Sequence, residues 1–126
     1  MRILVIDDDY VSRLKLKTLL SEYGDCDAVP SGEIGLQMFD SAKEEAIPYD
    51  LVTVDINMPG MRGPEIVKAI LKRDVNNVTK TLMVTGVVEI GEIADSFREN
   101  CDWCLRKPVN AQNIEESLKK IGIVKR

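Results

Sequence analysis

The sequence of 126 residues contains no histidine and only three cysteines. The lack of histidine excludes Ser/His/Asp and Cys/His catalysis, histidine metal ligands and a phosphohistidine carrier role. Three cysteines are an odd number, and in a reducing compartment we expect no structural disulfide framework.

The sequence also lacks a long hydrophobic run and an excess of basic residues. No apolar run approaches the ~20 residues that span a bilayer, and the short run after Met1 ends in three aspartates rather than a signal-peptide cleavage site. We therefore predict a cytoplasmic protein without membrane contact. Seventeen basic against 21 acidic residues give a net charge of −4, which argues against direct nucleic-acid binding.

What the sequence does contain is 44% hydrophobic residues, enough for one domain with its own core, predicted to span residues 1–126. Short, nearly continuous apolar runs alternate with helical periodicity, a pattern typical of parallel strands buried on both faces. The predicted strands are residues 2–6, 26–29, 50–54, 81–84 and 101–105. The predicted fold is α/β, with five βα units and helices on both faces of a parallel sheet.

Five helices are predicted between and after these strands. Gly24 is interpreted as the C-cap of the first, Ser31 as the N-cap of the second, and Pro64 as the first position of the third. The remaining two are indicated by apolar stripes: Ile90, Ile93, Ala94 and Phe97 for the fourth, and Ile114, Leu118 and Ile121 for the fifth.

Chemically reactive side chains follow four of the five predicted strands. Because the carboxyl ends of parallel strands meet at one edge of a sheet, where such folds bind ligands, we expect these side chains to converge. The converging set is three carboxylates, a hydroxyl and an ammonium group, from Asp7, Asp8, Asp55, Thr85 and Lys107.

Each of these residues alone has a purely structural explanation. An aspartate within residues 7–9 could cap a helix, and Asp55 could be a turn residue. Several like charges at one edge, however, repel one another unless positive charge lies among them. Mg²⁺, which takes oxygen ligands and retains waters, fits this requirement, and with Lys107 the set suits phosphoryl transfer.

The sequence resembles the receiver domain of two-component response regulators over essentially its whole length. The matching features, in order, are Asp7-Asp8, the segment 55–63 (DINMPGMRG) beginning with Asp55, Thr85-Gly86 and Lys107-Pro108. The resemblance implies a flavodoxin-like (βα)5 fold, with a doubly wound parallel sheet of five strands in the order 2-1-3-4-5.

The resemblance also implies roles for individual residues. Asp55 would be the phosphoacceptor, attacking phosphorus to form an aspartyl phosphate. Lys107 would pair with the phosphoryl group, and Thr85 would move to hydrogen-bond it as the switch step. The Lys107-Pro108 peptide bond would be cis.

A bound Mg²⁺ is implied in the same way. Asp8 and Asp55 would bind it directly, together with the backbone carbonyl of Asn57, and Asp7 would act through a metal-bound water. Asn57 and Val87 occupy positions that tune phosphoryl loss in the family. An apolar Val87 would not orient an attacking water, which favours slow self-hydrolysis.

The chain departs from the family pattern three residues before the lysine, where a tyrosine or phenylalanine usually turns inward during switching. Cys104 stands there, and Trp103 should point to the opposite face of its strand. The aromatic read-out of Thr85 movement is therefore expected to be missing. Gly91 lowers helix stability and makes the predicted fourth helix a candidate mobile element instead.

Two further features have competing interpretations. Cys101 and Cys104 form a C-x-x-C, but in a strand these side chains point to opposite faces, so half-buried thiols are favoured over a redox pair or half a zinc site. Val11 and Leu14 lie off the apolar stripe of the first helix. They are candidates for the surface that docks a phosphohistidine domain, or isolated surface residues.

The predicted function is a phosphorylation-switched binding module rather than an enzyme, catalysing only its own phosphorylation and dephosphorylation. The expected partners are a sensor histidine kinase or phosphotransfer domain and an unidentified downstream protein or output domain; the oligomeric state is open. One alternative is a Mg²⁺ phosphatase resembling haloacid dehalogenases, with Asp7 as nucleophile and Asp9 as acid/base. Another is a degenerate receiver acting as a scaffold, an option to which Cys104 gives some weight.

Overall fold

The computed structural model describes residues 1–56, 58–86 and 101–125. The elements in chain order are β1 (Arg2–Ile6), α1 (Tyr10–Leu20), β2 (Asp25–Val29), α2 (Gly32–Glu44), β3 (Leu51–Asp55), α3 (Gly63–Arg73), β4 (Lys80–Thr85), β5 (Trp103–Arg106) and α5 (Ala111–Lys120). The predicted helix containing Ile90, Ile93, Ala94 and Phe97 lies outside the described residues, as does Gly91.

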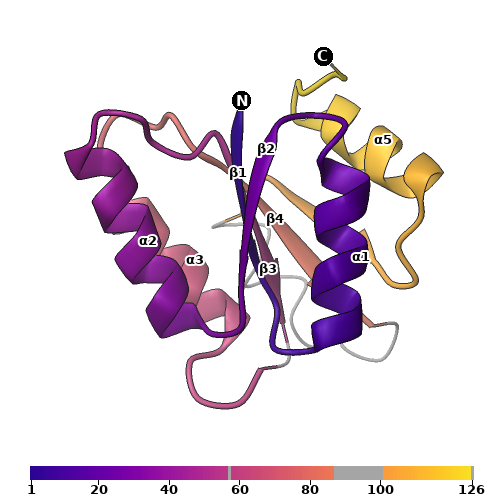
Figure 1. Cartoon of the computed structure of the whole chain (residues 1–126), viewed down its shortest axis with the longest axis horizontal. Coiled ribbons are helices and arrows are strands. Elements are labelled where there is room, and N and C mark those ends of the chain that lie inside the picture. Colours follow the sequence, from indigo (N-terminus) through magenta and orange to yellow (C-terminus); the bar gives the residue numbers. More distant parts are fainter. Residues whose placement is uncertain (57, 87–100, 126) are drawn as a thin grey trace.

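All five strands are parallel and form one sheet in the order β2-β1-β3-β4-β5. Helices α1 and α5 cover one face of this sheet, and α2 and α3 lie against the other (Figure 1). The predicted flavodoxin-like fold and strand order are therefore confirmed. Among the described residues, no helix combines the length and hydrophobicity needed to cross a membrane.

Two hydrophobic cores lie on opposite faces of the sheet. Side chains of β3 alternate between them: Val52 and Val54 join the core under α2 and α3, whereas Leu51 joins the core under α1 and α5. Because both faces of the central strands β1, β3 and β4 are buried, these strands need apolar residues at nearly every position. This explains why the strand segments read as continuous apolar runs rather than as alternating patterns.

The helix starts follow the predicted local signals. The Ser31 hydroxyl accepts a hydrogen bond from the backbone N–H of Ile34 at 3.2 Å, which caps α2, and Pro64 lies in the first turn of α3. Helix α5 begins with a reciprocal pair of capping hydrogen bonds, which was not predicted from the sequence. There Asn110 and Asn113 each accept the other's backbone N–H at 2.8 Å.

The interpretation of Gly24 as a helix cap is wrong. The C-cap of α1 is Ser21, which keeps a right-handed backbone. A Cβ on Gly24 would lie 2.4 Å from the carbonyl oxygen of Met1. The next residue, Asp25, donates its backbone N–H to that same oxygen at 2.9 Å. Glycine is needed here because the chain passes close to its own N-terminal residue, not because a helix ends.

Candidate functional site

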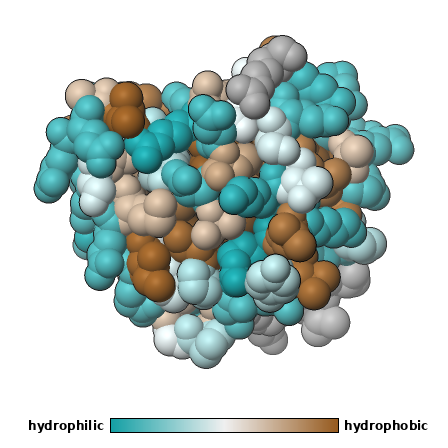
Figure 2. All heavy atoms as spheres, viewed as in Figure 1, coloured by the Kyte–Doolittle hydropathy of each residue, from teal (hydrophilic) through white to brown (hydrophobic). Residues whose placement is uncertain are grey.

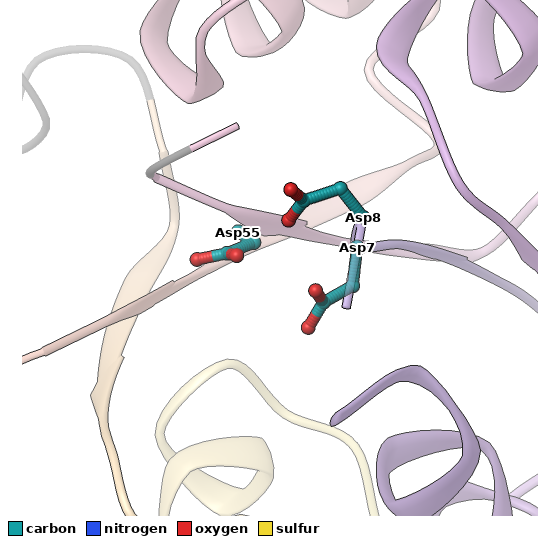
Figure 3. A group of neighbouring side chains, drawn as sticks. All are labelled: Asp7, Asp8 and Asp55. Carbon is teal, nitrogen blue, oxygen red and sulfur yellow. The ribbon is translucent and has the colours of Figure 1, made fainter. Parts of the chain in front are cut away.

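Three aspartates lie together at the carboxyl ends of β1 and β3. Ile6 is paired with Val54 in the parallel register, which places Asp7 and Asp55 at the next step of two neighbouring strands. One carboxylate oxygen from each of Asp7, Asp8 and Asp55 lies within 4.8 Å of the others. Figure 3 shows their side chains at the ends of the two strands. The predicted convergence of these carboxylates is therefore present.

Asp7 is the most deeply buried member of this acidic cluster, with no exposed surface. Its Oδ1 accepts the backbone N–H of Asp9 at 2.9 Å, whereas Oδ2 has no hydrogen-bond partner in the described part of the chain. Burial, and to a lesser extent the negative charge of Asp55, raises the pKa of Asp7 to about 6. A buried carboxylate oxygen without a donor is unfavourable unless a cation satisfies it. Three carboxylate oxygens that lie this close together are the kind of ligands that a hard divalent cation such as Mg²⁺ takes.

The three consecutive aspartates after β1 divide into different roles. Asp7 is buried, and Asp8 is exposed while still reaching the cluster. Asp9 accepts the backbone N–H of Ser12 at 2.9 Å and caps α1. This hydrogen bond lowers the pKa of Asp9. The capping explanation thus applies to one aspartate of the three, and Asp9 is not arranged as the acid/base of a phosphatase.

Lys107 supplies a positive charge beside Asp55. Its Nζ lies 3.5 Å from Asp55 Oδ1, and the Asp55 side chain is 7% exposed. The lysine follows β5, whose last residue Arg106 is paired with Thr85 on β4. The Lys107-Pro108 peptide bond is cis, as the family resemblance implied. The acidic cluster and its lysine thus come from the ends of three strands.

Thr85 ends β4 and is completely buried. Because Val84 is paired with Asp55, Thr85 lies one step beyond Asp55 along the neighbouring strand. Its hydroxyl donates a hydrogen bond to the carbonyl oxygen of Gly86 at 3.1 Å. Asn57 and Val87, the other two positions predicted to act here, lie outside the described residues.

The family model described as "Response regulator receiver domain" matches residues 3–119. The chain belongs to this family. The receiver is 28% identical over 120 residues to the chemotaxis protein CheY of Listeria monocytogenes, covering 95% of this chain and 97% of that protein. It is also 28% identical to the response regulator VraR of Staphylococcus saprophyticus, covering 95% of this chain but only 56% of VraR.

Solved structures agree with this assignment. The response regulator TrrA of Thermotoga maritima, solved in complex with Mg²⁺ and BeF, is similar with a TM-score of 0.77 and 32% identity, covering 95% of this chain and 97% of TrrA. A receiver domain from Clostridium thermocellum gives a TM-score of 0.77 at 29% identity, covering 90% of this chain and 86% of that one. The chain is therefore a two-component signalling domain, and its cluster of Asp7, Asp8 and Asp55 is an acidic pocket typical of phosphoacceptor sites.

The receiver's β5 carries the predicted departure from the family pattern. Cys104 is paired with Met83 and packs against the core under α2 and α3. Trp103 is 41% exposed, and the Lys120 Nζ of α5 lies 5.9 Å from its ring centroid. The two neighbouring side chains therefore lie on opposite faces, and Trp103 does not take the place of the missing aromatic residue.

The prediction that Cys101 and Cys104 point to opposite faces is wrong. Both pack against the same hydrophobic core, because β5 starts only at Trp103 and a bend at Asp102 precedes it. Both thiols are free and half-buried, as expected, and burial raises the pKa of each, to about 11 for Cys101. Raised pKa values disfavour the thiolate that redox and zinc chemistry require.

Two contributors to the receiver's site were not identified from the sequence. Gly63 begins α3, and a Cβ there would lie 3.1 Å from the Asp55 carbonyl oxygen and 2.7 Å from Met83 Cε. Its place before a proline was a visible signal of the helix start, but not of this close approach. Arg13 donates from Nη1 to the Asp7 carbonyl oxygen at 2.8 Å. Nothing in the local pattern of α1 marks that contact.

The surface of α1 beside the site is partly apolar. Val11 is 70% exposed, Leu14 is 51% exposed, and Tyr10 is 66% exposed. Figure 2 shows hydrophobic atoms on the face of the molecule that carries this helix. Val11 and Leu14, the two candidates predicted for a docking surface, are therefore accessible, and Tyr10 lies beside them on the same helix.

Proposed function

We propose that Asp55 accepts a phosphoryl group from a phosphohistidine of a sensor histidine kinase or phosphotransfer domain, and that this switches binding to a downstream partner. The observation that carries the proposal is the cluster itself. Three aspartate oxygens lie within 4.8 Å of one another, and the Lys107 ammonium lies 3.5 Å from Asp55. This combination of a carboxylate nucleophile and fixed positive charge is what phosphoryl transfer requires.

The acidic cluster would hold Mg²⁺ through Asp8 and Asp55, with Asp7 contributing through a water and Asn57 through its backbone carbonyl. The unsatisfied Oδ2 of Asp7 supports a cation at this place. When bound, the ion supplies charge neutralisation for the phosphoryl oxygens. The similarity to TrrA, a protein solved with Mg²⁺ and BeF, supports the same conclusion.

In the transfer step, an oxygen of Asp55 forms a bond to phosphorus while the bond from phosphorus to the donor's imidazole nitrogen breaks. The nitrogen keeps the electron pair of that bond. Lys107, now 3.5 Å from the Asp55 carboxylate, offers its ammonium to the added phosphoryl oxygens. Thr85 would turn its hydroxyl from the Gly86 carbonyl toward the phosphoryl group, which couples β4 to the new charge.

Receiver domains in two-component systems interact with histidine kinases and output partners. For this chain, we assign donor docking to the exposed apolar side chains of α1, because they lie on the helix that starts beside the acidic cluster. The domain would turn over no separate substrate and would catalyse only its own phosphorylation and dephosphorylation. The arrangement of Asp9 disfavours the phosphatase alternative, since its side chain caps α1.

Intact-mass spectrometry after incubation with acetyl phosphate tests the proposal. The wild-type protein should gain one phosphoryl group in Mg²⁺ and none in EDTA. Asp55→Asn should abolish the gain, because the amide cannot act as the nucleophile. Asp40→Asn is the matched control and should label like the wild type, because this half-exposed carboxylate of α2 is paired with Arg73 of α3 and is not part of the acidic cluster.

Other outcomes would contradict specific parts of the proposal. A gain that persists in Asp55→Asn but is lost in Asp7→Asn would move the acceptor to Asp7. A wild-type protein that is labelled neither by acetyl phosphate nor by a set of phosphorylated histidine kinases would support the scaffold alternative.

A further inference from the structure

The loop that carries two of the three cluster aspartates is tied down by several hydrogen bonds. Asp7 donates its backbone N–H to the Val29 carbonyl at 3.1 Å, and Asp9 donates its own to Asp7 Oδ1 at 2.9 Å. These contacts fix one side chain and one strand end. The peptide unit between Asp7 and Asp8 is held separately, through its carbonyl oxygen, by Arg13.

Arg13 reaches this carbonyl from the fourth position of α1. Side chains on a helix lean toward its N-terminus, so a long side chain there extends back over the preceding loop. The guanidinium lies 2.8 Å from the Asp7 carbonyl oxygen, and its Cζ lies 5.6 Å from the centroid of the Tyr10 ring. The backbone N–H of Arg13 is also bonded to the Asp9 carbonyl at 2.9 Å. The guanidinium is thus held between a ring and the loop that it contacts.

We infer that Arg13 is a positioning residue of the acidic cluster, which fixes the Asp7–Asp8 peptide and thereby the placement of both carboxylates for a divalent cation. The inference rests on the proposed function, in which these carboxylates bind Mg²⁺. The peptide orientation matters because buried Asp7 and exposed Asp8 lie on the two sides of this one unit. A rotation of that unit would move the two carboxylates apart.

A positioning role and a purely electrostatic role predict opposite signs. Arg13 carries a positive charge near a cation site, so as a charge alone it opposes Mg²⁺ binding, and its removal should tighten binding. As a positioning residue it supports binding, and its removal should weaken binding even though a repulsive charge is lost. The sign of the change therefore distinguishes the two roles.

The test is a Mg²⁺ titration of the full chain. Binding is monitored through the backbone amide chemical shifts of residues 7–9. The variants are Arg13→Met, which keeps an unbranched helix-forming side chain without a donor, and Arg13→Lys, which keeps the charge and a donor. Lys17→Met is the matched control, because it removes the same charge one helical turn farther along α1. Urea unfolding in EDTA measures the fold separately for each variant.

We expect Arg13→Met to weaken Mg²⁺ binding by about tenfold, as outer contacts to metal ligands commonly do. Arg13→Lys should recover part of this loss, and Lys17→Met should leave binding unchanged or slightly tighter. If Arg13→Met proves unstable, Arg13→Lys carries the test. A larger dissociation constant for Mg²⁺ in Arg13→Lys, at unchanged stability, would still show that binding depends on the guanidinium geometry.

The outcomes separate this inference from the function on which it rests. If the wild type binds Mg²⁺ and the Arg13 variants bind it equally or more tightly, the positioning role is overturned while the proposed function stands. If the wild type shows no Mg²⁺-dependent shift in residues 7–9, the metal site fails, and the inference fails with it.

Discussion

Acidic side chains at the two ends of the sheet have opposite surroundings. Those before strands accept backbone N–H groups: Asp50 accepts from Arg2 at 2.8 Å, and Asp102 accepts from Thr81 at 2.8 Å. Asp74, in the turn that leads into β4, accepts two such groups at 2.9 and 2.8 Å. These carboxylates connect a strand to the start of its neighbour or to the preceding turn. Backbone N–H groups close to them satisfy their oxygen atoms as hydrogen-bond acceptors.

Three of the aspartates that follow strands are packed against each other instead, while Asp9 caps α1. One carboxylate oxygen from each of Asp7, Asp8 and Asp55 lies within 4.8 Å of the others. Oδ2 of Asp7 has no hydrogen-bond partner among the described residues. Lys107 offsets only part of the charge, from 3.5 Å away and while 33% exposed. The same residue type thus stabilises the fold at the amino ends of the strands, whereas the clustered aspartates at the carboxyl ends oppose it. That opposition is what makes the carboxyl ends suited to bind a cation and react.

The largest expected effect is that Asp7→Asn stabilises the protein in EDTA at pH 7.5. The pKa of Asp7 is raised from 3.8 to about 6 in the fold, so the folded state binds its proton more tightly than the unfolded state does. The stability that this proton contributes is full below pH ~4 and is lost as pH rises through about 6. The wild type therefore forgoes about 3 kcal/mol above pH 6. Asparagine keeps the acceptor for Asp9 and should recover 1 to 3 kcal/mol, on the order of that loss.

Urea unfolding in EDTA across pH 4 to 8 measures this effect. The wild-type free energy of unfolding should fall between about pH 4 and pH 6 relative to that of Asp7→Asn. Asp8→Asn is the control, because it removes an equal charge from an exposed member of the cluster and should change stability by less than about 0.5 kcal/mol. Equal pH profiles for wild type and Asp7→Asn would contradict the assigned cost of burying Asp7.

A smaller effect is expected when Mg²⁺ is added. At ten times its dissociation constant, Mg²⁺ should raise the wild-type free energy of unfolding by about 1.4 kcal/mol at pH 7.5. The increase should shrink below pH 6, because protonation of Asp7 removes a charge from the cluster. It should also be reduced in Asp7→Asn. Thermal unfolding with and without EDTA checks both, and a pH-independent increase would place the cation elsewhere.

The sequence alone was sufficient to predict which chemistry meets at the sheet edge. Apolar runs identify the strands, and parallel strand ends share an edge, so the convergence of Asp7, Asp55 and Lys107 follows from their positions after strands. The family resemblance added the strand order and the cis Lys107-Pro108 bond, neither of which composition or periodicity carries. Ser31 was identified because a cap is a local interaction between residues three apart.

What could not be predicted depends on contacts between distant segments or on exact element ends. Gly24 has the sequence position of a helix cap, and only the approach of Met1 shows its actual role. The C-x-x-C was assigned to opposite faces because β5 was predicted to start at residue 101; the bend at Asp102 changes the face of Cys101. The separate roles of the three aspartates after β1 likewise required the position at which α1 begins.

The smallest expected effect tests the stabilising end of the comparison. Asp102 accepts hydrogen bonds from the backbone N–H and the hydroxyl of Thr81, at 2.8 and 3.3 Å, but it is exposed to solvent. Asp102→Ala should therefore lower the free energy of unfolding by about 1 kcal/mol at pH 7.5, and Asp102→Asn, which keeps an acceptor oxygen, by less. Both variants should bind Mg²⁺ like the wild type, because the change lies at the far end of β5 from Lys107. An increase in stability, as expected for Asp7→Asn, would mean that net negative charge rather than position governs both ends of the sheet.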